Sequence, residues 1–300
     1  MPGAVRWISS PSISKREGSR REGSSGPSVT SRLMIKAVTL DFWGTLLFDS
    51  PATDESYKRQ RLVGIERILK KAGVKVALRD LDRAYEESGR RLAQIWQTRR
   101  DVPVRQPVTM LLEALDPELP ESLAPKVIAD LIHAYSSPAL VVPPAVDDGA
   151  KAALEGLAAR GLTLCVVSNT MRTPGEVLRK LLDRYGLLTP LTVLTFSEEC
   201  GIRKPDPEIF LLTLRQVGVP PEEAVHVGDD PVLDVEGARD AGMQVIQVTA
   251  GGRATGPVKP DAVITRLSEL PAALAALAGT SRQSFAIDKE TERYGAARFR

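Results

Sequence analysis

The chain has 300 residues, enough for one large α/β domain or two smaller ones, and 43% of them are hydrophobic while only 5% are aromatic. The 40 basic and 38 acidic residues give a formal net charge of +2, and the small excess lies in residues 1–33, which hold six basic and two acidic residues. The remainder offers no basic field for nucleic-acid binding, and no apolar run approaches the length of a membrane span.

Both ends of the chain are polar. Residues 1–33 are rich in Ser, Arg and Gly and lack the apolar middle of a secretory signal, so we expect a disordered N-terminal tail. A start codon placed too early is the simpler origin of this stretch, and an organelle-targeting segment is the alternative. Residues 279–300 are expected to form a polar C-terminal tail. The two cysteines, Cys165 and Cys200, show no metal-ligand spacing or disulfide framework, which favours a reducing, cytoplasmic location.

The first half of the chain changes from a strand pattern to a helical one. Residues 35–40 form an apolar, β-branched run that ends abruptly at Asp41, which predicts a strand that feeds a turn. Residues 52–140 contain no convincing strand and are predicted to be a helical insertion. Its helices are expected at residues 55–72 and 79–98, around 108–115, and at 122–135.

The second half alternates strands with helices. Such alternation predicts an α/β fold in which a parallel sheet has helices on both faces. Strands are expected at residues 162–167, 193–196, 224–227 and 244–248, and helices at residues 147–159, at 175–185 and from Pro207 onward. The core domain would then comprise residues 34–51 and 141–278.

Three polar clusters follow apolar strands directly: Asp41–Thr45, Ser168–Thr170 and Gly228–Asp234. In open parallel sheets, ligands bind outside the carboxyl ends of the strands, so these clusters and the loop at Lys204 are expected to form one site. Ser168 and Asn169 fit two roles here, because capping a helix and binding an anion use the same geometry. His226 lies inside an apolar strand and is interpreted as a core histidine.

The polar clusters carry a family resemblance. The chain resembles the haloacid dehalogenase-like (HAD) hydrolase superfamily over about residues 34–275, and in particular its subgroup with a helical cap. The resemblance implies a Rossmann-like core, with residues 52–140 as a cap domain inserted after the first strand. The matching pieces are Asp41-Phe42-Trp43-Gly44-Thr45-Leu46, Val167-Ser168-Asn169, Arg203-Lys204-Pro205-Asp206-Pro207, and Gly228-Asp229-Asp230 with Asp234.

The same resemblance suggests catalytic roles that fit the residue types. Asp41 is the expected nucleophile, because a carboxylate can form a covalent intermediate that water later resolves. Thr45 offers a hydroxyl donor for an anionic substrate. Lys204 would keep Asp41 ionised and offset charge in the transition state. Ser168, Asn169 and Trp43 are the predicted substrate-binding residues.

A magnesium site is expected beside the nucleophile. Asp229 and Asp230 are hard oxygen donors that, with Asp41, offer the few carboxylates that Mg²⁺ requires. The ion would reduce repulsion between the nucleophile and an anionic substrate. Asp234 is predicted to orient Lys204 or its loop and not to bind the metal.

Trp43 departs from the pattern of the phosphatases in this superfamily. Those enzymes usually carry a second Asp at this position, which protonates the leaving group, whereas indole only donates a hydrogen bond. The 2-haloacid dehalogenases of the superfamily carry an aromatic Tyr there, and their halide leaves unprotonated. Because those enzymes lack the paired acids that Asp229 and Asp230 provide, the metal evidence has the greater weight. Trp43 should then restrict the substrates to good leaving groups, such as acyl phosphates.

Three functions remain in order of preference. The first is a Mg²⁺-dependent, phosphatase-like hydrolase of a small phosphorylated metabolite. The second is a metal-independent hydrolase of the 2-haloacid dehalogenase type, and the third is a non-catalytic binding protein that keeps the pocket. All three predict a small-molecule partner, with no nucleic acid and no membrane. The sequence predicts neither the substrate nor the oligomeric state, nor which of Arg90, Arg91, Arg99 and Arg100 would contact a substrate.

Overall fold

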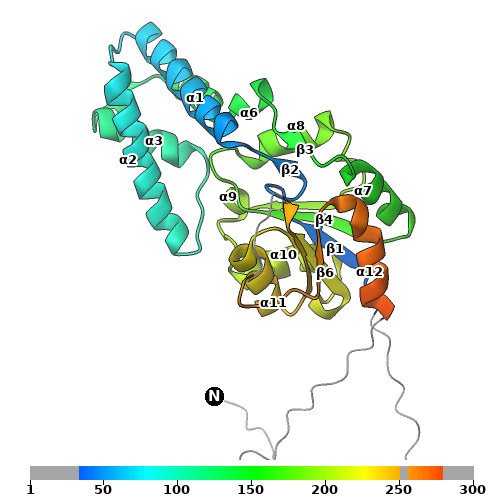
Figure 1. Cartoon of the computed structure of the whole chain (residues 1–300). Coiled ribbons are helices and arrows are strands. Elements are labelled where there is room, and N and C mark those ends of the chain that lie inside the picture. Colours follow the sequence, from blue (N-terminus) through cyan, green and yellow to red (C-terminus); the bar gives the residue numbers. More distant parts are fainter. Residues whose placement is uncertain (1–33, 251–255, 280–300) are drawn as a thin grey trace, which may run out of the picture. The chain divides into compact units, whose positions relative to one another are not determined.

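A computed structural model describes residues 34–250 and 256–279 of the chain. Its centre is a parallel sheet of six strands in the order β5-β4-β1-β6-β7-β8 (Figure 1). The predicted α/β fold is confirmed. The strands are β1 Ala37–Leu40, β4 Thr163–Ser168, β5 Val193–Phe196, β6 Ala224–Gly228, β7 Gln244–Val248 and β8 Ala262–Ile264.

The central strands are buried on both sides, which explains their continuous apolar runs. In β1, Val38 and Leu40 pack into one hydrophobic cluster, whereas Ala37 packs into another on the opposite face. The first cluster is completed by α7 Ala150–Ala159, α8 Gly175–Arg184 and α12 Leu270–Gly279, and the second by α10 Pro207–Val217 and α11 Gly237–Asp240. Helices therefore cover both faces of the sheet (Figure 1).

The segment between β1 and β4 is helical, as expected, and has its own hydrophobic cluster, built around Leu81, Tyr85, Leu111 and Tyr135. Residues 51–141 are described throughout and contain no strand. The division into core and cap domains stays a prediction. The helices are α1 Pro51–Lys71, α2 Leu78–Gln97, α3 Arg105–Leu115, α4 Leu119–Ser122, α5 Pro125–Ser136 and α6 Pro138–Val141.

Local signals set several helix boundaries. Ser50 caps α1 by accepting a hydrogen bond from the Thr53 amide at 3.1 Å. Asp206 caps α10 in the same way, and Pro207 occupies the first turn, as predicted. The remaining short helices are α9 Ser197–Cys200, η1 Pro221–Glu223 and η4 Leu267–Glu269, together with the π-helical turn η2 Pro231–Glu236.

Two features were not predicted. The helical segment begins and ends at a short antiparallel pair, β2 Leu47–Phe48 with β3 Ala145–Val146, and β8 forms the far edge of the sheet. Strands of two or three residues are too short for a readable alternation of polar and apolar positions. The predicted tails, residues 1–33 and 279–300, lie outside the described residues except for Gly279. No described helix combines the length and the apolar composition needed to cross a membrane.

The loop between α2 and α3 ties the helical segment to the core. Asp101 forms a buried ion pair with Arg203 at 2.7 Å, and the backbone of Arg203 donates a hydrogen bond to the Arg99 carbonyl at 3.1 Å. The Arg203 guanidinium also stacks 4.1 Å from the ring centre of Trp96, whose indole N–H donates to Asp101 at 2.9 Å. The helical segment is thus held to the core at a point far from its two chain connections.

Candidate active site

The predicted site residues meet at one edge of the sheet. Asp41 follows β1, Ser168 ends β4 and Asp229 follows β6, and these three strands are direct neighbours. Their carboxyl ends therefore bring the three side chains together, as the strand pattern indicated. A cavity of about 830 Å³ opens here, lined by Asp41, Trp43, Asn169, Lys204, Asp229 and Asp230 among others.

Lys204 is the central cation of this cavity. Its ammonium lies 2.7 Å from Asp41 Oδ1 and donates a hydrogen bond of 2.6 Å to Asp234 Oδ1, and all three side chains are buried. Asp234 Oδ1 also lies 3.0 Å from His226 Nε2, and the Nδ1 atom of the same ring lies 2.8 Å from the Thr39 hydroxyl. Asp234 thus contacts Lys204 directly, and His226, interpreted as a core histidine, supports Asp234.

These charges shift one another's pKa values. Burial would lower the pKa of Lys204, but Asp234 and Asp41 outweigh this effect and raise it. Burial raises the pKa of Asp41, and although Lys204 opposes the rise, Asp234 adds to it. Burial also acts against the Asp234 carboxylate, but Lys204 and His226 together hold its pKa well below the usual range. Lys204 stays charged, and a further cation would favour the ionised form of Asp41.

Several buried polar atoms, in the segment after β1 and at the end of β4, have no hydrogen-bond partner within the described part of the chain. Trp43 Nε1, Thr45 Oγ1 and Ser168 Oγ are buried and accept or donate no hydrogen bond among the described residues. The contact between Asp41 Oδ1 and Lys204 is likewise an ion pair without hydrogen-bond geometry. Because buried polar groups are usually satisfied, this concentration of donors suits an anionic ligand.

Asn169 has a positioning role in this structure. Its amide nitrogen donates to the Lys204 carbonyl at 3.0 Å, and its amide oxygen accepts from the Lys204 N–H at 2.8 Å. Asn169 thereby fixes the loop that carries the cation. It also lines the cavity, and its predicted contact with substrate stays a prediction.

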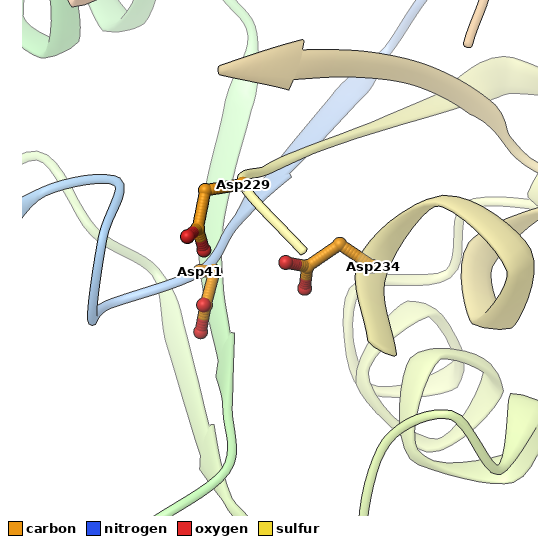
Figure 2. A group of neighbouring side chains, drawn as sticks. All are labelled: Asp41, Asp229 and Asp234. Carbon is orange, nitrogen blue, oxygen red and sulfur yellow. The ribbon is translucent and has the colours of Figure 1, made fainter. Parts of the chain in front are cut away.

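Three carboxylates are close enough to share a metal ion: Asp41, Asp229 and Asp234, with ligand oxygens within 4.8 Å of one another (Figure 2). Asp229 packs against Gly44, where an added Cβ would meet Asp229 Oδ2 at 2.5 Å. Asp230 Oδ1 caps η2 by accepting hydrogen bonds from the backbone amides of Val232 and Leu233, at 2.9 Å each. Its role as a metal ligand stays a prediction.

The sequence interpretation missed two cavity arginines. Arg61 of α1 and Arg172, in the loop after β4, line the same cavity as Asp41. None of the four arginines considered from the sequence lies in that lining. The sequence did contain one indication that Arg61 is buried. It lies four residues from both Tyr57 and Ile65, and therefore on the buried face of α1.

Sequence comparison now agrees with this geometry. Residues 35–242 match the family model described as haloacid dehalogenase-like hydrolase. The chain belongs to this family. Within it, the chain is 32% identical over 222 residues to the glyceraldehyde 3-phosphate phosphatase of Methanopyrus kandleri, covering 73% of this chain and 85% of that protein.

Another relative matches a shorter part of the chain. The phosphoserine phosphatase of Thermus thermophilus is 39% identical over 112 residues, which is 37% of this chain and 44% of that protein. The chain therefore spans less than half the length of this curated relative. Two solved structures share the fold. A 2-haloacid dehalogenase from Pseudomonas syringae pv. tomato is 28% identical, with a TM-score of 0.59, and the match covers 81% of this chain and 99% of that one. A HAD phosphatase from Thermococcus onnurineus is 26% identical, with a TM-score of 0.51, and the match covers 80% of this chain and 97% of that one.

Proposed function

We propose that this HAD-family hydrolase is a Mg²⁺-dependent phosphatase of small metabolites, with Asp41 as its nucleophile. The supporting observations are the unpartnered buried donors at these strand ends, Trp43 Nε1, Thr45 Oγ1 and Ser168 Oγ, and the ion pair of Asp41 with Lys204. These groups match the acceptor oxygens of a phosphoryl group. The phosphatase names of the relatives from Methanopyrus kandleri and Thermus thermophilus point to the same chemistry.

The proposed reaction has two steps. A carboxylate oxygen of Asp41 attacks phosphorus, and the bond from phosphorus to the leaving oxygen breaks, which leaves an aspartyl phosphate. Water then attacks phosphorus, releases inorganic phosphate and restores Asp41. Throughout, Lys204 offsets the negative charge, and the Thr45 and Ser168 hydroxyls donate hydrogen bonds to phosphoryl oxygens.

The residues present fit a divalent cation. Asp41 and Asp229 would hold it, because Asp234 already pairs with Lys204 and His226. The close approach of Asp229 to Gly44 fixes that carboxylate beside the nucleophile. When bound, Mg²⁺ neutralises charge between the nucleophile and the phosphoryl group.

Trp43 sets the leaving group in this proposal. Its ring packs edge-on against Phe42, with ring centres 4.9 Å apart, and its indole N–H donates hydrogen bonds but does not exchange protons near neutral pH. A leaving group that departs without a proton, such as the acetate of acetyl phosphate, should therefore be preferred over an alkoxide.

The helical segment would act as the cap. Residues on α1 and α2, including Tyr57, Arg61 and Trp96, line the cavity opposite Asp41 and Lys204. A substrate would therefore lie between the two parts of the chain, and we propose that residues 52–140 select it.

The test uses the full chain with acetyl phosphate, para-nitrophenyl phosphate and 2-chloropropionate, each with magnesium or EDTA. Asp41→Asn is the matched control, because it removes the charge and keeps the shape. Phosphate release that needs magnesium and is lost in the control supports the proposal. No phosphate release from either acetyl phosphate or para-nitrophenyl phosphate contradicts it and favours the non-catalytic binding protein.

A dehalogenase is the second candidate, because of Trp43 and the likeness to the Pseudomonas syringae enzyme. It requires chloride release from 2-chloropropionate that EDTA does not affect. That result would assign Asp229 to a structural role.

A further inference from the structure

Two guanidinium groups face the cavity without an acidic partner. Among the described residues, no carboxylate oxygen lies within 4.0 Å of a side-chain nitrogen of Arg61 or Arg172. Arginine stays charged in proteins, and a buried charge is costly unless it is paired. Asp49 acts on the Arg61 charge and Glu86 on the Arg172 charge, but both carboxylates do so from beyond that distance.

Arg61 is buried and has only neutral partners. Its Nε donates to the Tyr135 carbonyl at 2.8 Å, while its two terminal nitrogens reach the Tyr85 hydroxyl at 3.4 Å and the Thr173 hydroxyl at 3.5 Å. The last two contacts are long, and a guanidinium has five donors. Arg61 therefore keeps donor capacity for a ligand.

Arg172 reaches from the core into the helical segment. Its guanidinium stacks 4.4 Å from the ring centre of Tyr85, and its Nε is buried with no hydrogen-bond partner. The group lies against Gly89 of α2, where an added Cβ would come within 2.3 Å of Nη2. Gly89 thus leaves the space that the Arg172 guanidinium occupies.

We infer that Arg61 and Arg172 bind a second anionic group of the substrate, a carboxylate or a second phosphate, while the reacting phosphoryl group lies at Asp41. Two guanidinium forks on one cavity wall suit a planar or tetrahedral oxyanion. The inference rests on the proposed phosphatase function and narrows its substrates to phosphorylated compounds that carry a second anionic group.

The test compares three esters that differ in one group: 2-hydroxyethyl phosphate, 2-phosphoglycolate and ethane-1,2-diol bisphosphate. We expect kcat/KM to be about tenfold to a hundredfold higher for one or both of the esters with a second anionic group, the range of one or two charge-assisted hydrogen bonds. The better of the two identifies the second group as carboxylate or phosphate. Equal kcat/KM for all three esters contradicts the inference and leaves the phosphatase function intact.

Variants separate binding from folding. Arg172→Met keeps an unbranched side chain against Tyr85 but removes the charge. The kcat/KM for the better of the two esters with a second anionic group, divided by the kcat/KM for 2-hydroxyethyl phosphate, should then fall close to one. Gly89→Ala displaces the same guanidinium while raising helix propensity, so it should lower that ratio without lowering the melting temperature. Gly156→Ala in α7 is its control, because nothing lies within 4 Å of the added Cβ, and it should leave the ratio unchanged.

If none of the three alkyl esters is hydrolysed while acetyl phosphate is, the phosphatase proposal stands with its preference for acyl phosphates, and the second-anion inference is read from binding alone. Calorimetry with Asp41→Asn then compares 2-phosphoglycolate with 2-hydroxyethyl phosphate. Affinity at least tenfold higher for 2-phosphoglycolate, lost in the double variant with Arg172→Met, supports the second anion site. Equal affinities, or a preference that survives Arg172→Met, contradict it.

Discussion

The ion pair between Asp101 and Arg203 should be a large contributor to stability, although it lies outside the proposed chemistry. Both side chains are buried, and Asp101 also accepts hydrogen bonds from Trp96 at 2.9 Å and Ser197 at 2.5 Å. Asp101→Asn leaves the Arg203 charge buried without its partner, which typically costs about 3–5 kcal/mol. At about 2–4 °C per kcal/mol for a chain of this size, the melting temperature should fall by roughly 6–20 °C.

Equilibrium urea denaturation followed by circular dichroism measures this change as a lower midpoint at an unchanged m-value. The matched control is Asp130→Asn, which breaks an exposed pair with Lys126 on α5 and should change stability by less than about 0.5 kcal/mol. Equal losses in the two variants would refute the reasoning. A loss confined to a separate early transition would show instead that the helical segment detaches before the core unfolds.

Three further predictions concern the site itself. Trp43→Asp places a carboxylate where a general acid acts, so turnover of alkyl phosphates should rise relative to acetyl phosphate by up to about 10²-fold, measured as a ratio of kcat values. Gly44→Ala would press a Cβ against Asp229 at a backbone φ of 76°, so Mg²⁺ should raise the melting temperature less than in the parent chain. The folded pKa of Asp234 lies well below its unfolded value near 4, so its pairing with Lys204 contributes fully above pH 4 and is lost progressively as the pH falls from there toward the folded pKa. Asp234→Asn should therefore lower stability most at pH 7, and its cost should shrink steadily as the pH falls below about 4, as measured by urea midpoints across pH.

The parallel sheet was predictable because its strands are buried on both faces. Continuous apolar runs such as Leu164–Val167 have no other simple explanation when each ends in a polar cluster. The same logic located the site, since neighbouring strands β4, β1 and β6 end at Ser168, Asp41 and Asp229. The sequence could not show that Asp230 Oδ1 caps η2, or that a carboxylate oxygen of Asp234 lies within 4.8 Å of one of Asp41.

Long-range partners were also beyond sequence reasoning. Arg172 and Asp101 look like ordinary surface charges, because their partners, Tyr85 and Arg203, are many residues distant. Arg61 was closer to being readable, since a charge within a buried helical stripe is unusual. Only the packing of α1 and α2 against the core makes Arg61 and Arg172 part of the cavity.

The loops that carry Asn169 and Lys204 contribute side chains both to the site and to the contact with the helical segment. Within three residues of Asn169, Arg172 enters the helical segment, and directly before Lys204, Arg203 does the same. The helical segment is therefore not an interchangeable module. A chimaera that carries the helical segment of another family member on this sheet would need residues equivalent to Gly89, Trp96 and Asp101. Without them, the grafted helices would displace the loops that hold the Lys204 ammonium in place.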